Sequence, residues 1–213
     1  MIKLYSFFNS STSYRVRIAL ALKGLPYDYE AVNLRSGEQR ADAYREMSPA
    51  GIVPVLIDGD VRLTQSLAII DYLDRAYPEP RLTPEEPASR GRALEIAQTI
   101  ACEIHPINNL RVLKYLTGEL GVDEAAKSAW YQHWVAEGLG AVEQLLDAGP
   151  EGQFCVGDAP TIADCCLVPQ VANALRMGCE LGGLTRVMQL YERCMGMERF
   201  VSAAPQSQPD YIK

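Results

Sequence analysis

Hydroxyl side chains gather at the start of a patterned helix in residues 9–20, which read Asn-Ser-Ser-Thr-Ser-Tyr-Arg-Val-Arg-Ile-Ala-Leu. The preceding residues 2–7 alternate like a strand, so Ser10, Ser11 and Thr12 fall at an expected strand-to-helix turn. A helix N-terminus carries unpaired N–H groups and about half a positive charge, and hydroxyl groups add further donors. The turn therefore suits an anion, although a single serine could serve there only as the helix N-cap.

The composition is that of a globular chain with an acidic balance. The 213 residues are 48% hydrophobic, enough for a sizeable core in one large domain or two modest ones. A formal net charge of −7 disfavours nucleic acid and anionic membranes as partners. No apolar run approaches the roughly 20 residues of a spanning helix, and the N-terminus lacks a signal-peptide layout. We therefore expect a cytoplasmic protein.

The cysteines and histidines favour neither a disulfide scaffold nor a metal centre. The six cysteines all lie beyond residue 100 and lack C-x-x-C spacing, so we expect free or buried thiols in a reducing compartment. His105 and His133 are the only histidines, and neither belongs to an H-x-x-x-H motif, so no metal site is expected. Residues 1–80 contain no cysteine, which disfavours a thiol-disulfide oxidoreductase.

The first part of the chain alternates between strand and helix patterns. Strands are expected at 2–7, 28–34, 53–57 and 61–64, and helices at 12–23, 41–47 and 66–77. Gly24 followed by Pro26 ends the first helix, and Asp58-Gly59 predicts a tight hairpin. A βαβ unit followed by a ββα unit predicts a mixed four-stranded sheet with helices packed on it.

A proline-rich segment at 78–87 is expected to be a linker between domain 1–80 and an all-helical domain 88–213. Residues 88–120 have helical spacing with an expected bend near Pro106, and 123–146 form a second long helix. Thr161 and Asp164 resemble a capping box that opens a buried helix through Leu175. Shorter helices and a polar tail at 205–213 follow.

This organisation resembles the cytosolic glutathione transferases, and local motifs carry the resemblance over nearly the whole chain. Val53-Pro54-Val55-Leu56 and Leu63-Thr64-Gln65-Ser66-Leu67-Ala68 look like the glutathione-binding half of that family. The motifs Ser10-Ser11-x-Ser13-x-Arg15-Val16-Arg17, His105-Pro106-Ile107-Asn108-Asn109-Leu110, Phe154-Cys155-Val156-Gly157-Asp158 and Gln208-Pro209-Asp210 are similar to the zeta class. The implied architecture is α/β plus all-α: a thioredoxin-like domain followed by a helical bundle.

The resemblance implies a glutathione site in the first domain. Val53 would precede a cis-proline and pair its backbone with the cysteinyl part of glutathione, the alternative being an ordinary X-Pro bond. Gln65 and Ser66 would receive the γ-glutamyl carboxylate at a helix start, the alternative being a plain N-cap. Ser10 and Ser11 would act on the thiol, with Thr12 also in contact with glutathione.

Three residues of the second domain are implied to complete the site. Arg176 would face the cleft and bind a substrate carboxylate, the alternative being a solvated helix arginine. His105 and Asn109, four residues apart on one helix face, would reach glutathione across a dimer or have structural roles. At position 9 the family commonly has Arg where this chain has Asn, which removes one candidate carboxylate clamp.

The zeta class contains the maleylacetoacetate and maleylpyruvate isomerases. The resemblance therefore implies a glutathione-dependent cis–trans isomerase of aromatic amino acid or aromatic compound catabolism, cytoplasmic and homodimeric, with an anionic substrate and no metal. One alternative is a glutathione transferase acting on α-halo acids or other electrophiles. Another is a non-catalytic glutathione-binding scaffold, against which the intact hydroxyl turn argues.

Overall fold

A four-stranded mixed sheet with strand order β2-β1-β3-β4 forms the centre of the N-terminal half. Its strands are β1 (Ile2–Ser6), β2 (Tyr27–Ala31), β3 (Val55–Asp58) and β4 (Val61–Thr64). Strand β1 runs parallel to β2 and antiparallel to β3, and β3 pairs antiparallel with β4. The predicted mixed sheet is confirmed. Strand β2 is shorter than expected because Asn33 turns the chain, accepting the Arg35 and Ser36 N–H groups through Oδ1.

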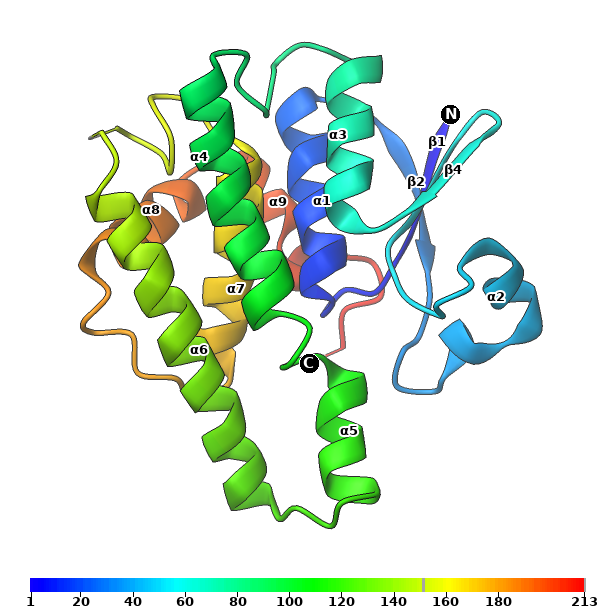
Figure 1. Ribbon diagram of the computed structural model, residues 1–213. Helices are drawn as coiled ribbons and strands as arrows, with labels where there is room; N and C mark the ends of the chain where they lie inside the picture. The colour runs from blue at the N-terminus through cyan, green and yellow to red at the C-terminus, as the bar shows by residue number, and fades with distance from the viewer. Residues whose placement is uncertain (151, 213) are drawn as a thin grey trace. The chain divides into compact units, whose positions relative to one another are not determined.

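Helices cover both faces of this sheet. Helix α1 (Ser11–Lys23) packs beside α3 (Ser66–Ala76) on one side, and α2 (Asp42–Met47) lies on the other (Figure 1). The short helix η1 (Glu38–Arg40) precedes α2, and Tyr44 of α2 joins a core cluster. The other buried members of that cluster come from the sheet and its loops: Phe7, Phe8, Val32, Val53 and Val55.

Local sequence signals end α1 and form the hairpin where they were expected. Gly24 has φ 64°, and its N–H donates to the Ala21 carbonyl, as in a left-handed helix cap. Strands β3 and β4 pair Asp58 with Val61, which leaves a two-residue loop, and Gly59 in it has φ 57°.

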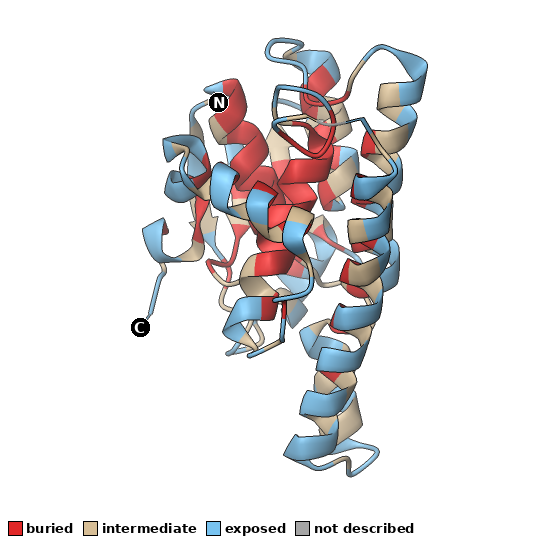
Figure 2. Cartoon of the chain, turned by 90° about the vertical axis from the view of Figure 1, so that its left-hand side faces the viewer, coloured by how far each residue is buried: buried red, intermediate tan, exposed pale blue. Residues whose placement is uncertain are grey.

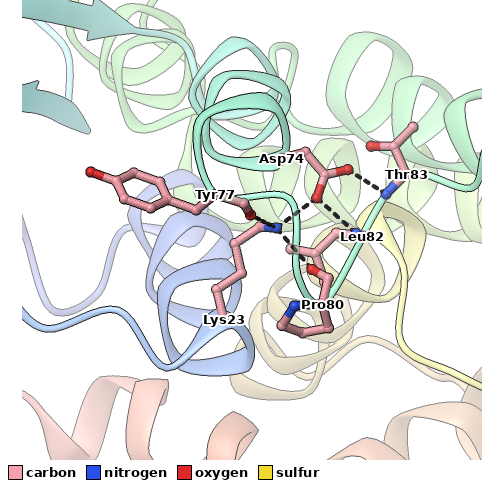
Figure 3. Close-up of polar contacts among 6 residues, drawn as sticks. All are labelled: Lys23, Asp74, Tyr77, Pro80, Leu82 and Thr83. Carbon is pink, nitrogen blue, oxygen red and sulfur yellow. Dashed lines mark hydrogen bonds and ion pairs between the residues drawn. The ribbon is translucent and has the colours of Figure 1, made fainter.

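The start of the proline-rich segment is hydrogen-bonded to the first unit. Lys23 Nζ lies 2.8 Å from Asp74 Oδ1 and donates to the Tyr77 and Pro80 carbonyls, also at 2.8 Å (Figure 3). Asp74 in turn accepts the N–H groups of Leu82 at 2.8 Å and Thr83 at 2.7 Å. Both charged side chains are buried, and this network satisfies them.

The boundary between the two units, after Thr83, lies within the expected linker 78–87. Pro87 is the first residue of helix α4 (Pro87–Gln98), where a missing N–H is harmless, and Glu86 caps that helix.

The second unit is built of helices. It contains α4, the π-helix η2 (Thr99–Ile104), α5 (Leu110–Gly118), α6 (Glu124–Asp147), α7 (Ile162–Arg176) and α8 (Thr185–Met195). Helix α4 packs on α7, and η2 packs on α6 and α7. Within this unit α7 is buried along most of its length, whereas the helices generally expose their outer faces (Figure 2). The predicted capping box is present at the start of α7, with Asp164 Oδ2 accepting the Thr161 N–H at 2.7 Å.

Residues 88–120 do not form the single bent helix that was expected. Helix α4 passes into the π-helix η2, a turn follows at 105–109, and α5 begins anew after its N-cap Asn109. Pro106 explains the break because proline has no N–H to donate to the preceding turn.

The structure is a computed structural model that describes residues 1–150 and 152–212. Two compact units are present: Met1–Thr83 together with the segment from Met195 onward, and Pro84–Cys194. The tail, which includes α9 (Glu198–Ala203) and η3 (Pro205–Ser207), thus belongs with the sheet, and α9 packs on α1. The expected boundaries assigned this tail to the helical domain. In the described part of the chain, every helix is too short or too polar to cross a bilayer.

Candidate functional site

The hydroxyl turn, residues 10–12, joins β1 to α1 as the sequence predicted. Ser10 is the N-cap of α1, with φ −82° and ψ 118°, and its Oγ accepts the Ser13 N–H at 3.2 Å. The N-cap alternative is therefore correct for Ser10, without removing its second capacity as an O–H donor. Ser11 follows as the first residue of α1 and is buried.

A hydrogen bond ties the hydroxyl turn to the segment before β3. Thr12 Oγ1 donates to the Val53 carbonyl at 3.0 Å, and the Val53-Pro54 bond is cis, as the resemblance implied. Ser10 Oγ lies 2.9 Å from Thr12 Oγ1. Because the single Thr12 proton points to Val53, Ser10 is the donor in this pair, so Ser10, Thr12 and Val53 form a directed chain.

The second expected binding point lies at the N-terminus of α3. Gln65 is the N-cap residue, with φ 72° and ψ 113°, and it makes no side-chain capping bond. No other described non-glycine residue has positive φ, a conformation that costs of order 1–3 kcal/mol and concentrates at functional sites. Ser66 is the first helical residue and is buried, so it is not a plain N-cap.

Arg15 is a residue of this site to which sequence reasoning gave no role. Its Nη1 donates to Ser66 Oγ at 3.3 Å, although the residue is only 2% exposed. Within the described chain, its Nε and Nη2 are buried without a hydrogen-bond partner. A buried guanidinium with so few partners is expensive and points to an anion that it serves. The sequence feature that could have indicated a role for Arg15 is its position as a cationic residue among apolar neighbours in the first helix.

The remaining expected residues all lie in the second unit. Arg176 is the last residue of α7, is exposed, and donates from Nη2 to Asn173 Oδ1 at 3.2 Å. Its charge partly offsets the burial that raises the pKa of Tyr131 to about 12. The solvated position leaves the guanidinium accessible to an anionic ligand.

His105 and Asn109 do not share one helix face. His105 follows η2, whereas Asn109 has φ −65° and ψ 147° and caps α5 by accepting the Arg111 N–H. The two side chains nevertheless meet, with Asn109 Nδ2 at 3.1 Å from His105 Nε2. The turn at Pro106 accounts for this, because i to i+4 spacing places residues together on a face only within a continuous helix.

In the first unit, this arrangement suits a small acidic peptide that carries a thiol. Two helix N-termini, at Ser11 and Ser66, supply N–H groups and hydroxyls for negative charge. A hydrogen bond to a charged acceptor is worth about 1.5–3 kcal/mol and a helix N-terminus about 0.3–1. Since about 1.36 kcal/mol equals one pKa unit, the hydroxyl turn has the capacity to lower a thiol pKa by about one to three units.

The comparisons with known proteins agree with this geometry. Residues 4–81 match the family described as the glutathione S-transferase N-terminal domain. A probable maleylacetoacetate isomerase of Vibrio cholerae is 46% identical over 209 residues, which are 97% of each chain. The holo structure of a maleyl pyruvate isomerase, described as a bacterial glutathione S-transferase in Zeta class, has a TM-score of 0.96 and 44% identity, covering 99% of this chain and 100% of that one.

A third relative carries ligands. The maleylacetoacetate isomerase of Anaeromyxobacter dehalogenans, solved with dicarboxyethyl glutathione and citrate in its active site, has a TM-score of 0.88 and 37% identity, covering 100% of this chain and 94% of that one. With similarity of this extent along the full chain, the protein belongs to the glutathione transferase family, in the zeta class with the maleylacetoacetate and maleylpyruvate isomerases.

Proposed function

We propose that this protein is a glutathione-dependent enzyme that converts maleylacetoacetate or maleylpyruvate to its fumaryl isomer. The observation that carries the proposal is the directed chain from Ser10 through Thr12 to Val53, which places a hydroxyl-lined helix start beside a cis-proline segment. The isomerases named above share this chain's fold and more than a third of its residues.

Glutathione would bind along the first unit. Its γ-glutamyl carboxylate would lie at Gln65 and Ser66, where Arg15 adds positive charge behind the helix start. The backbone of Val53 would pair with the cysteinyl part, and the thiol would lie at Ser10, Ser11 and Thr12. The relative that binds a dicarboxyethyl glutathione supports this choice of ligand.

The reaction requires only a thiolate and a polarised double bond. The thiolate sulfur would add to one carbon of the cis double bond, and the π electrons would move to the conjugated carbonyl oxygen. Rotation about the resulting single bond would follow. Breaking the carbon–sulfur bond would then return the electrons, form the trans double bond and release the thiolate. Substrate and product have the same atoms and electrons, and glutathione is regenerated.

Arg176 is proposed to bind a substrate carboxylate, which its exposed guanidinium suits. His105 and Asn109 are proposed to contact glutathione in a homodimer, and we propose the cytoplasm as the location. Light scattering of the purified protein tests the homodimer.

A second candidate is displacement of halide from α-halo acids by glutathione. It is favoured by Asn9, which stands where the resemblance predicts an arginine able to clamp a second carboxylate. A substrate with one carboxylate would need only Arg176.

An ultraviolet assay separates the two candidates. Maleylacetoacetate, maleylpyruvate and a chlorinated carboxylic acid are each incubated with enzyme, with and without glutathione. The isomerase proposal expects fumaryl product only with glutathione present and no loss of free thiol. Release of chloride with equal loss of thiol, and no fumaryl product, would establish the second candidate instead. Ser10→Ala serves as the impaired control.

A further inference from the structure

The C-terminal tail reaches the backbone that leads into the hydroxyl turn. Asp210 Oδ2 accepts the Phe8 N–H at 3.0 Å, and its Oδ1 accepts the Tyr29 hydroxyl at 2.6 Å. The ring of Tyr211 also meets that of Phe8 edge to face, with the centroids 5.5 Å apart. The bond from Phe8 to Asp210 spans 202 positions of sequence, and the bond from Tyr29 spans 181. The tail is therefore a specific partner of this segment.

Arg17 holds the same segment through its carbonyl groups. Its guanidinium donates to the Phe7 carbonyl at 3.3 Å and to the Phe8 carbonyl at 3.0 Å, and its Nε donates to the Ala203 carbonyl at 2.8 Å. Arg17 is fully buried, so these bonds are made away from water. Arg17 thereby also connects the segment that leads into the hydroxyl turn with α9, which ends at Ala203.

Asp210 and Arg17 together restrain Phe7 and Phe8, the segment that leads into the hydroxyl turn. Ser10 donates its backbone N–H to the Phe7 carbonyl at 2.9 Å, so the N-cap is bonded directly to the segment that Arg17 and Asp210 hold. Asp210 is the member of this arrangement that binds the Phe8 N–H, a group that Arg17 cannot serve because a guanidinium has no acceptor.

We propose that Asp210 is a positioning residue for the reaction, which fixes the hydroxyl turn through the Phe8 N–H. The inference rests on the proposed glutathione chemistry at that turn. The rate of an oriented reaction is sensitive to small displacements, and a misplacement of about 1 Å lowers the rate by up to about a hundredfold. A donor directed at a thiolate loses strength in the same way when its angle changes.

The test measures two quantities in Asp210→Ala: the pKa of the thiol in bound glutathione, from thiolate absorbance without substrate, and the kinetic constants with maleylpyruvate. We expect the thiol pKa to rise by about half to one unit and kcat to fall by about tenfold, with KM changed less than kcat. Asp210→Asn should recover part of both losses, because its amide oxygen still accepts the Phe8 N–H.

Two matched variants separate positioning from other effects. Tyr29→Phe removes the other bond of Asp210 and should leave kcat within about twofold, since Phe8 keeps its acceptor. Asp28→Ala removes an equal charge from an exposed position of β2 and should leave both quantities unchanged.

The outcomes distinguish the two proposals. The positioning role is overturned if Asp210→Ala matches Asp28→Ala, or if it lowers the melting temperature while the thiol pKa and kcat at a temperature far below melting stay unchanged. If the wild-type protein itself does not lower the thiol pKa of glutathione, the proposed function fails, whatever the variant does.

Discussion

Arg15 and Ser66 are joined by a hydrogen bond of 3.3 Å from the guanidinium Nη1 to the hydroxyl Oγ, which links helix α1 to the first residue of α3. Both residues are buried. Because Ser66 accepts this bond, its own hydroxyl proton remains available for an anion at the helix N-terminus. The pair therefore combines a buried charge with a donor at the place proposed for the γ-glutamyl carboxylate.

Replacing Arg15 by methionine should weaken glutathione binding without unfolding the protein. Loss of a charged hydrogen bond worth about 1.5–3 kcal/mol predicts a rise of about tenfold or more in the dissociation constant, measured by calorimetry. The melting temperature should stay equal or rise, because an under-partnered buried charge is replaced by an apolar chain. Cysteinylglycine, which lacks the γ-glutamyl group, is the control ligand and should bind both proteins alike. An equal loss for both ligands would show that Arg15 only supports the fold.

Ser10 or Ser11, rather than Thr12, should supply the main donor to the thiolate. Turning the Thr12 proton toward the thiolate would take it from the Val53 carbonyl, whereas the Ser10 proton would leave only the neighbouring Thr12 hydroxyl. Ser10→Ala or Ser11→Ala should therefore raise the pKa of the bound thiol by about one unit or more, on the strength of one charged hydrogen bond. Thr12→Val should have the smaller effect. Unchanged values in both serine variants, with a rise in Thr12→Val, would contradict this assignment.

Arg176→Ala should impair anionic substrates selectively. A hydrogen bond to a charged group is worth about 1.5–3 kcal/mol, so kcat/KM for a maleyl keto acid should fall about tenfold or more. A chlorinated nitrobenzene, which is neutral, should react at a nearly unchanged rate. If positions 9 and 176 serve the same substrate anion, adding Asn9→Arg to Arg176→Ala should restore part of the lost kcat/KM.

Arg193→Ala is the matched control for Arg176, because Arg193 is an exposed arginine of α8. Arg193→Ala should leave the rates with the maleyl keto acid and with the chlorinated nitrobenzene unaltered. Equal loss of the charged and neutral activities in Arg176→Ala would assign that arginine a structural role.

Lys23→Met should destabilise the protein strongly. Breaking a buried ion pair costs about 3–5 kcal/mol because the remaining charge loses its partner, here Asp74. The carbonyls of Tyr77 and Pro80 also lose their donor. Chemical denaturation measures the change in free energy of unfolding. Arg75→Met, which breaks an exposed pair with Asp71, is the control and should cost less than about 1 kcal/mol.

Thiol alkylation should follow burial and pKa. Burial raises the pKa of the Cys155 and Cys194 thiols, so at pH 8 their reactive thiolate fraction falls below that of an ordinary cysteine. Cys102 is exposed and should be modified first by iodoacetamide, with Cys179, whose pKa burial also raises, reacting more slowly. Mass spectrometry of the native protein checks the order. Early labelling of Cys155 or Cys194 would show that the second unit opens readily.

Local sequence signals predicted the parts of the fold that depend on neighbouring residues. The serine N-cap, Gly24, the Asp58-Gly59 hairpin and the Thr161 capping box all lie where their residue types indicated. Each device works through contacts within a few positions of the chain. The cis bond before Pro54 came from the family resemblance rather than from such signals.

Contacts between distant positions were not predictable in the same way. Arg15 meets Ser66 across 51 positions, and Asp210 meets Phe8 across 202, so neither pair leaves a periodic pattern. The proline-rich segment does contain the division between the two units, but its composition gave no sign that the Lys23 and Asp74 side chains would bind its backbone. The i to i+4 spacing of His105 and Asn109 assumed an unbroken helix, which Pro106 interrupts.

The number of turnovers per glutathione distinguishes catalytic from stoichiometric use of the thiol. Maleylpyruvate in large excess is mixed with enzyme and a limiting amount of glutathione, and fumaryl product and free thiol are measured in the same sample. A glutathione-dependent isomerase should give many moles of trans product per mole of glutathione, with the free thiol unchanged at the end. Consumption of one thiol for each substrate molecule, or equal conversion without glutathione, would contradict it.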